Sequence, residues 1–455
     1  MPASGVLELI GNTPLVEVKR LDAGACRLFL KLENQNPGGS IKDRVALAMV
    51  EAAEREGKLK SDSLIVEATA GNTGLGLALV AAQKGYRLLI VVPDKMSQEK
   101  IFHLKAMGAE VVLTRSDVGK GHPEYYQDLA ARLAAEKGAF YVNQFANAAN
   151  PRAHEETTGP EIWEQMEHNV DAVVAGVGTG GTLTGLSRFF ARVSPATEMV
   201  LADPAGSIVA EYVNTGKISK DVGSWLVEGI GEDFIPPVAD LARVKKGYSI
   251  PDKEAFNVCR DLLRKEGIMA GTSSGTLIAA ALRYCREQKQ ARRVVTLVPD
   301  SGNKYLSKVY NDYWMIDQGF LEREKYGDLR DLIARRHKEH AVATVNADET
   351  VLAAHQRMKL YDVSQLPVLK DGRIVGIVDE EDILMEVADN PAHFGEPVTE
   401  AMESHLVTVP PGASHAQLLE IFKRGLVAIV MDGDEFLGLI TRIDFLNWLR
   451  RRTQQ

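Results

Sequence analysis

Residues 36–44 read NPGGSIKDR and lead directly into the helical pattern VALAMVEAAEREGKL at residues 45–59. Ser40 is a favourable N-cap residue, and Asp43 three positions later completes a pair that resembles a capping box. This arrangement predicts that Lys42 lies in the first turn of a helix. The helix dipole disfavours a cation there, which makes the lysine a better amine nucleophile. Taken alone, the stretch also fits an ordinary surface lysine.

Composition excludes several classes of protein. The chain has 455 residues, 45% hydrophobic and 25% charged, which fits a globular protein of two or three domains. A net charge of -9 without a basic stripe argues against a nucleic-acid partner. Three widely spaced cysteines form no disulfide framework or metal site, and no signal peptide or membrane-length apolar run is present. We therefore expect a cytoplasmic protein that binds no metal, nucleic acid or membrane.

Short apolar strands alternate with helical stretches up to about residue 320, and this alternation predicts an α/β region with parallel sheets covered on both faces. The length suggests two such layers with a cleft between them. The expected strands are residues 64–68, 86–94, 109–114, 171–177, 198–204 and 292–300.

The C-terminal part contains an internal repeat. Residues 366–384 align with residues 426–446, and the landmark pairs Gly376/Gly438 and Asp382/Asp444 share a spacing of 62 residues. The charged stretch that precedes the repeat is predicted to be a helical linker. The expected domains are therefore 1–320, a linker at 321–338, and a tandem module at 339–455 with repeats at about 339–390 and 395–455.

Three Gly-rich loops follow expected strands, where open α/β sheets bind ligands. TAGNTG (69–74) suits a carboxylate, GVGTGGT (176–182) suits a phosphate, and GTSSGT (271–276) places two serines at a helix start. One of those serines is expected to cap its helix. The second loop also satisfies G-x-G-x-x-G, with Asp203 at the end of the next strand, so a dinucleotide site stays open at this point.

A nucleophilic lysine, a phosphate loop, an amide and a serine together describe a site for pyridoxal 5′-phosphate. LIGNTPLV (9–16), NPGGSIKDR, the three loops and EGIGEDFIP (228–236) are similar, in order and spacing, to motifs of the fold-type II pyridoxal-phosphate enzymes. Within them the chain most resembles the cystathionine β-synthase family, with cysteine synthases next. The resemblance covers about residues 4–320 and implies a two-layered catalytic region like that of the tryptophan synthase β chain.

The resemblance also assigns roles to single residues. Lys42 matches the lysine that holds the cofactor and removes the substrate α-proton, Asn72 the contact to the ring oxygen, and Ser273 the partner of the pyridine nitrogen. A hydroxyl there favours β-elimination and β-addition. The matching phosphate loop is Gly178, Thr179, Gly180, Gly181 and Thr182. The matching substrate-carboxylate group is Thr69, Ala70, Gly71, Asn72 and Thr73, with Gln144.

EGIGEDFIP distinguishes the two branches. Cysteine synthases typically have small residues before Phe-Ile-Pro, whereas this chain has Glu232 and Asp233, which follow Gly229. Acidic side chains at a cleft mouth suit the ammonium group of homocysteine, although a solvated acidic turn is the alternative. Ala70 and Phe145 replace hydroxyl residues of many relatives, which leaves the leaving group, hydroxyl or acetyl, open.

Residues 339–455 resemble a Bateman module of two CBS domains. In that family a Thr or Ser followed by x-x-Asp contacts adenosyl ligands, and the second repeat keeps Thr441 and Asp444. The first repeat has Asp379, whose charge disfavours phosphates. S-adenosylmethionine at one site and a module without ligand both stay open.

The implied activity is condensation of L-serine, or O-acetylserine, with L-homocysteine to L-cystathionine in a homodimer or higher homo-oligomer, with sulfide release from alternative substrates. We expect no haem, because the core begins by residue 4 and no CxxC is present. A cysteine synthase with a regulatory tail is the first alternative, and a serine or threonine dehydratase is more distant. A nucleotide-sensing protein with a vestigial catalytic region is the alternative from another class.

Overall fold

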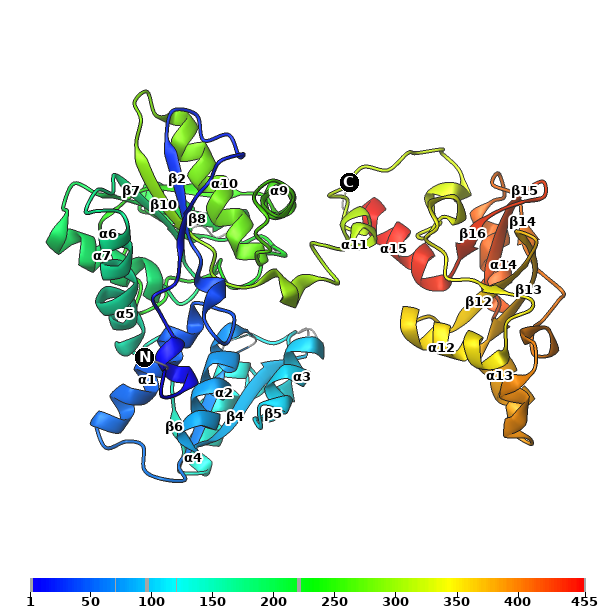
Figure 1. Cartoon of the computed structure of the whole chain (residues 1–455), viewed down its shortest axis with the longest axis horizontal. Coiled ribbons are helices and arrows are strands. Elements are labelled where there is room, and N and C mark those ends of the chain that lie inside the picture. The colour runs from blue at the N-terminus through cyan, green and yellow to red at the C-terminus, as the bar shows by residue number, and fades with distance from the viewer. Residues whose placement is uncertain (1–2, 70, 95–97, 120, 219–221, 454–455) are drawn as a thin grey trace. The chain divides into compact units, whose positions relative to one another are not determined.

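Parallel strands alternating with helices build the first part of the chain, as the sequence predicts (Figure 1). The computed structural model describes residues 3–69, 71–94, 98–119, 121–218 and 222–453. Contacts divide the chain into two units, Met1–Tyr310 and Asn311–Gln455. The division falls after Tyr310, whereas the sequence pattern places the end of the first domain at residue 320.

The first unit contains two sheets. A four-stranded sheet has the order β5-β4-β3-β6 with all strands parallel, and a six-stranded sheet has the order β1-β2-β10-β7-β8-β9 with only β1 antiparallel to its neighbour. The six predicted strands correspond to β3, β4, β5, β7, β8 and β10. The bounds are β1 Leu15–Glu17, β2 Arg27–Lys31, β3 Leu64–Ala68, β4 Arg87–Pro93, β5 Glu110–Thr114, β6 Phe140–Tyr141, β7 Ala172–Gly176, β8 Glu198–Pro204, β9 Val244–Ile250 and β10 Arg293–Leu297.

Helices cover both faces of the four-stranded sheet. One face packs against α1 and α2 through residues such as Met49, Leu77 and Ile90, and the other packs against α4 through Val66 and Leu129. Among the described residues, no helix has both the length and the apolar character needed to cross a membrane. The bounds are α1 Lys42–Arg55, α2 Asn72–Lys84, α3 Gln98–Ala106, α4 Tyr126–Glu136, α5 Ala149–Ala153, α6 Gly159–Gln165, α7 Gly181–Val193, α8 Val209–Thr215, α9 Asp252–Asp261 and α10 Thr272–Glu287.

The start of α1 differs from the predicted capping box. The helix begins at Lys42, as expected, but its N-cap is Ile41, which lacks a capping side chain. Ser40 Oγ accepts a hydrogen bond from the Lys42 N–H at 3.3 Å, and the Asp43 carboxylate turns back to accept the N–H of Gly38 at 2.5 Å. Asp43 therefore stabilises the Gly-Gly turn before the helix instead of capping the helix itself.

The second unit confirms the predicted duplication. Each repeat forms a three-stranded sheet, β11-β12-β13 or β14-β15-β16. The two hairpins have a register irregularity at Val368 and at Val430, which repeats the 62-residue spacing. The bounds are β11 Val345–Asn346, β12 Gln365–Lys370, β13 Arg373–Asp379, β14 Thr408–Val409, β15 Ala428–Asp432, β16 Glu435–Ile440, α11 Asp312–Asp317, α12 Val351–Tyr361, α13 Glu380–Val387, α14 His415–Lys423 and α15 Arg442–Thr453.

The predicted helical linker at residues 321–338 is wrong. The structure describes all of these residues, and they contain only 3-10 turns, at Leu329–Asp331 and from His337 onward. Leu329, Leu332 and Ile333 are buried in the core of the second repeat. The segment is therefore held by apolar contacts within the second unit. Its high charge density gives no sign of these contacts in the sequence.

Candidate active site

A cavity of about 750 Å³ lies at the carboxyl ends of strands from both sheets of the first unit, among the segments that follow β3, β7 and β10. This is the edge at which open α/β folds bind ligands, and the volume suits a small molecule. Predicted site residues that line the cavity are Lys42, Thr69, Gly71, Asn72, Thr73, Gln144, Gly178, Thr179, Gly180, Thr182, Gly229, Glu232, Asp233 and Ser273. Gly181 packs behind the loop against Asn150, and Ala70 lies outside the described residues.

Lys42 enters the cavity from the first turn of α1. Burial lowers the pKa of Lys42 to about 8, and the carboxylates of Asp300 and Glu232 oppose that decrease. At neutral pH a lysine with this pKa is neutral about a tenth of the time, far more often than a lysine in water. Lys42 can therefore act as an amine nucleophile and as a base.

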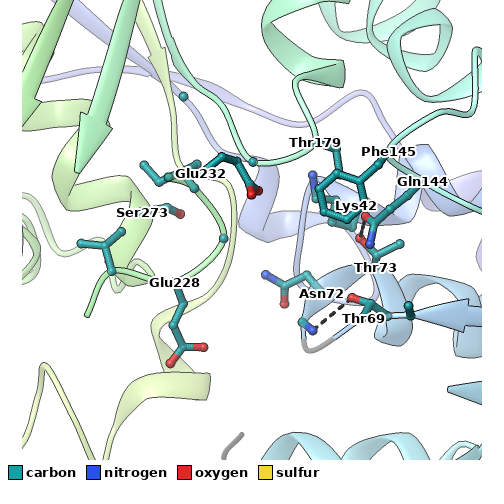
Figure 2. Close-up of a pocket in the computed structure, with 18 of the residues that line it drawn as sticks. Lys42, Thr69, Asn72, Thr73, Gln144, Phe145, Thr179, Glu228, Glu232 and Ser273 are labelled. Atoms are coloured by element: carbon teal, nitrogen blue, oxygen red, sulfur yellow. Dashed lines mark hydrogen bonds between the residues drawn. The ribbon is translucent and has the colours of Figure 1, made fainter. Parts of the chain in front are cut away.

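The start of α2 forms the side of the cavity that suits a carboxylate. Thr69 Oγ1 accepts the N–H of Gly71 at 3.2 Å, and Thr73 Oγ1 donates to Gln144 Oε1 at 2.6 Å. Figure 2 shows Thr73 and Gln144 beside Lys42 on one side of the pocket. The N–H groups in the first turn of α2 and the side-chain N–H groups of Gln144 supply donors for an anionic substrate group.

The loop between β7 and α7 packs closely against neighbouring segments at its glycines. A Cβ on Gly178 would lie 2.5 Å from the carbonyl oxygen of Gly229, and one on Gly181 would lie 1.9 Å from Asn150 Oδ1. Asn150 Nδ2 donates to Thr179 Oγ1 at 2.9 Å, which fixes the loop from behind. The first N–H groups of α7 are thus presented at a helix N-terminus, where a phosphate binds favourably.

Asp203 does not serve a dinucleotide at this loop. Its carboxylate is fully buried and accepts the N–H of Ala210 in α8 at 2.8 Å. The acidic residue that the G-x-G-x-x-G pattern requires for a ribose is therefore engaged in anchoring the next helix. This arrangement favours a simple phosphate group over a dinucleotide.

Ser273 lies in the first turn of α10 and lines the cavity opposite Lys42 (Figure 2). The sequence predicted that one of the two serines caps this helix, and that prediction is wrong, because the N-cap is Gly271 and no side chain caps it. The Ser273 hydroxyl is a weak hydrogen-bond partner that does not force protonation of a ring nitrogen.

Glu232 differs electrostatically from the carboxylate that the sequence suggests. Burial raises the pKa of Glu232 to about 8, and the charges of Asp233 and Asp203 add to that increase, whereas Lys42 opposes it. At neutral pH Glu232 is therefore largely a protonated carboxyl that donates a hydrogen bond. Glu228 on the same loop forms ion pairs with Lys100 and Lys308.

Sequence reasoning missed the segment that follows β10. Asp300 accepts hydrogen bonds from Asn72 and Tyr305, and Lys304 donates to Asn72. The signal was available, because PDSGNKY (299–305) follows the buried strand β10, as TAGNTG follows β3 and GVGTGGT follows β7, whereas GTSSGT follows a helical segment. It has a single glycine, so it lacks the glycine pattern that marks the other three loops as ligand loops.

A second cavity of about 660 Å³ lies between the two repeats of the second unit, lined by Thr441, Asp444 and Asp379. Thr441 Oγ1 donates to Asp444 Oδ2 at 2.6 Å, and in the other repeat Asp379 caps α13 with Asp382 completing the capping box. The two predicted regulatory positions therefore share one cavity with the corresponding acidic position of the first repeat.

The residues of the first cavity fit pyridoxal phosphate. A buried amine of lowered pKa, the glycine loop at the N-terminus of α7 and the Ser273 hydroxyl all line the same space. These are the groups needed for an aldehyde, a phosphate and a pyridine nitrogen.

Comparisons with known proteins agree with this geometry. A family model for pyridoxal-phosphate dependent enzymes matches residues 6–300, and the CBS domain model matches residues 331–389 and 398–451. Cystathionine beta-synthase of Dictyostelium discoideum is 35% identical, covering 99% of this chain and 93% of the relative. The Saccharomyces cerevisiae protein of that name is 34% identical, covering 98% of this chain and 97% of the relative.

Solved structures resemble the first unit. A hydrogen sulfide-producing enzyme from Fusobacterium nucleatum has a TM-score of 0.61 and 39% identity, covering 67% of this chain and 100% of that one. An O-ureido-L-serine synthase has a TM-score of 0.63 and 33% identity, covering 70% of this chain and 100% of that one.

Proposed function

This chain belongs to the cystathionine beta-synthase family of pyridoxal-phosphate-dependent enzymes, and from that premise we propose that its cavity joins L-serine, or O-acetylserine, to L-homocysteine. The products are L-cystathionine and water, or acetate when the donor is acetylated. The observation that supports this most strongly is a lysine of lowered pKa in one cavity with the phosphate loop and Ser273.

The proposed roles follow the geometry. When bound, pyridoxal phosphate supplies the electron-withdrawing ring that makes the substrate α-proton acidic and lets the β-substituent leave. Lys42 holds the cofactor through Nζ and moves the α-proton, while residues 178–182 hold the phosphate and Ser273 faces the ring nitrogen. Asn72 offers its amide to the ring oxygen. The start of α2, with Gln144, orients the substrate carboxylate.

Glu232 is proposed to act as a neutral donor at the mouth of the cavity. Its raised pKa means that it carries a proton at pH 7, so it can protonate the departing hydroxyl of serine. Asp233 next to it is exposed and keeps the role of attracting the homocysteine ammonium group. The sequence predicted that both residues bind the ammonium group, whereas this proposal gives that role to Asp233 alone.

Sulfide release is a second candidate activity. It is supported by the 39% identity to the hydrogen sulfide-producing enzyme. With cysteine in place of serine, the same replacement by homocysteine would give cystathionine and hydrogen sulfide. The homodimer remains a prediction that light scattering of the purified protein would check.

Absorbance spectroscopy tests the cofactor assignment. The wild type supplied with pyridoxal phosphate is expected to show a visible band that Lys42→Ala abolishes, with Lys105→Ala, a substitution outside the cavity, as the control. A colourless wild type would contradict the proposal.

For the second cavity, calorimetric titration with S-adenosylmethionine distinguishes a module that binds this ligand from a module without ligand. Titration with ATP tests a ligand that carries phosphates. Acidic side chains outnumber the two arginines in the lining, which supports a ligand without phosphate, so we expect no binding of ATP.

A further inference from the structure

The Asn72 amide is held on both sides by charged groups. Asn72 Nδ2 donates to Asp300 Oδ2 at 2.8 Å, and Lys304 Nζ donates to Asn72 Oδ1 at 2.7 Å. A carboxylate only accepts hydrogen bonds and an ammonium only donates them, so a single orientation of the amide satisfies both neighbours. The amide nitrogen carries two protons, and the second remains for another acceptor.

Asp300 is itself fixed at the meeting point of three elements. It is 1% exposed, its backbone bridges that of Ser40 just before α1, and its carbonyl accepts the N–H of Gly271 at 3.0 Å at the start of α10. Tyr305 donates to the same carboxylate at 2.7 Å. A Cβ on Gly271 would lie 1.8 Å from Asp300 Oδ1, so glycine there leaves room for the carboxylate. The position of Asp300 is therefore set independently of Asn72.

Amide orientation matters for the group that Asn72 is proposed to meet. The ring oxygen of pyridoxal phosphate is a hydrogen-bond acceptor, so an N–H pointing toward it is attractive. A flipped amide would present its carbonyl oxygen to a ring oxygen, to Asp300 or to both, and each of these contacts is repulsive.

We propose that Asp300 and Lys304 are positioning residues that fix the Asn72 amide with an N–H available to the ring oxygen of the cofactor. This inference rests on the proposed function, because it requires that Asn72 meet the cofactor. Neither residue is assigned a contact with the cofactor, so both act through Asn72.

A double-mutant cycle on the full-length apoenzyme tests the proposal. The dissociation constant of pyridoxal phosphate is measured by fluorescence titration for the wild type, Asn72→Ala, Asp300→Ala and the double variant. The titration is run at pH 9, above the Lys42 pKa of about 8, where most of Lys42 is already neutral and loss of the Asp300 charge changes that fraction only slightly. We expect each single substitution to raise the dissociation constant about tenfold, as for one hydrogen bond to a charged group.

The double variant decides the mechanism. If Asp300 acts through Asn72, the double variant also binds about tenfold more weakly than the wild type, because the second change removes nothing further. An additive loss of about a hundredfold would overturn the proposal. Circular dichroism checks that each variant folds. If Asp300→Ala does not fold, the same cycle with Lys304→Met, at a half-buried position, distinguishes the same two outcomes.

Asp171→Ala is the matched control. Asp171 is a carboxylate that accepts the backbone N–H of Arg293 at 2.7 Å and does not line the cavity. We expect its dissociation constant to equal that of the wild type. An increase as large as that of Asp300→Ala would overturn the proposal, since the loss of a hydrogen-bonded carboxylate outside the cavity would then have the same effect. A wild type that binds no pyridoxal phosphate would overturn the proposed function and this inference with it.

Discussion

Lys42 and Glu232 line the same cavity, and each stabilises the charged form of the other while burial stabilises the neutral form of both. The Glu232 carboxylate raises the pKa of Lys42, and the Lys42 ammonium lowers the pKa of Glu232. Burial outweighs these charges, so both pKa values lie at about 8. An amine and a carboxyl with similar pKa values are suited to moving protons in both directions near neutral pH.

The first prediction concerns the alkaline limb of activity. Glu232 is protonated below about pH 8 and ionises above it, so kcat/KM of the wild type should fall about tenfold per pH unit above that value. Glu232→Gln, whose amide donates a hydrogen bond but cannot transfer a proton, should have a lower kcat/KM with serine at neutral pH and should lack this limb. Asp233→Asn, a change at the exposed neighbour, should retain the limb but move it to lower pH, because the Asp233 charge contributes to the raised pKa of Glu232. Identical limbs in the wild type and Glu232→Gln would show that another group titrates.

The second prediction concerns Glu67, which is buried at the end of β3. Burial raises the pKa of Glu67 to about 8, although it accepts the N–H groups of Ala68 and Gln144. The unfolded state releases this proton near pH 4.3, so between that pH and about 8 the folded state binds more protons and stability falls as pH rises. Glu67→Gln should remove this loss.

Thermal unfolding at two pH values checks the sign. The melting temperature of Glu67→Gln relative to the wild type should be higher at pH 8 than at pH 4.5. The expected difference is about 2–4 °C for each kcal/mol of unfolding free energy that the wild type loses between these two pH values. Glu56→Gln, at an exposed position, should show no such change. A difference that has the same value at both pH values would mean that Glu67 is already ionised in the fold.

The third prediction concerns a buried ion network that anchors α1. Arg44 forms ion pairs with Glu33 at 2.7 Å and with Glu161 at 2.6 Å, and Lys31 pairs with Glu161 at 2.7 Å. Arg44→Met leaves Glu33 buried without its partner and should cost about 3–5 kcal/mol in unfolding free energy. Urea denaturation measures this cost. The exposed pair of Arg115 with Asp117 is the control, where Arg115→Ala should leave the free energy of unfolding close to that of the wild type.

Part of the site follows from the sequence, because the loops after β3 and β7 lie at strand-to-helix junctions. Strands β3 and β7 and helix α10 were evident from apolar runs and glycine patterns. The two strands belong to different sheets, and the segments that follow their carboxyl ends both line the cavity. Lys42 was found because local signals fix where α1 begins. These features depend on residues that are close together in the sequence, so local sequence patterns predict them.

Features that depend on distant contacts were missed. Asp43 bonds to Gly38 instead of capping α1, and the turn that allows this is visible only in three dimensions. Residues 321–338 have the charge density of a solvated helix, yet three of their apolar side chains are buried in the second repeat. Asp300 is separated from Asn72 by most of the catalytic region, so no local pattern links the two residues.

A product assay tests the proposed activity most directly. The purified protein with pyridoxal phosphate is offered serine or O-acetylserine, each paired with homocysteine or with sulfide, and the products are identified by mass spectrometry. We expect cystathionine as the dominant product, and the better donor will identify the preferred leaving group. Cysteine as the dominant product would contradict the proposed function and make the chain a cysteine synthase with a regulatory module.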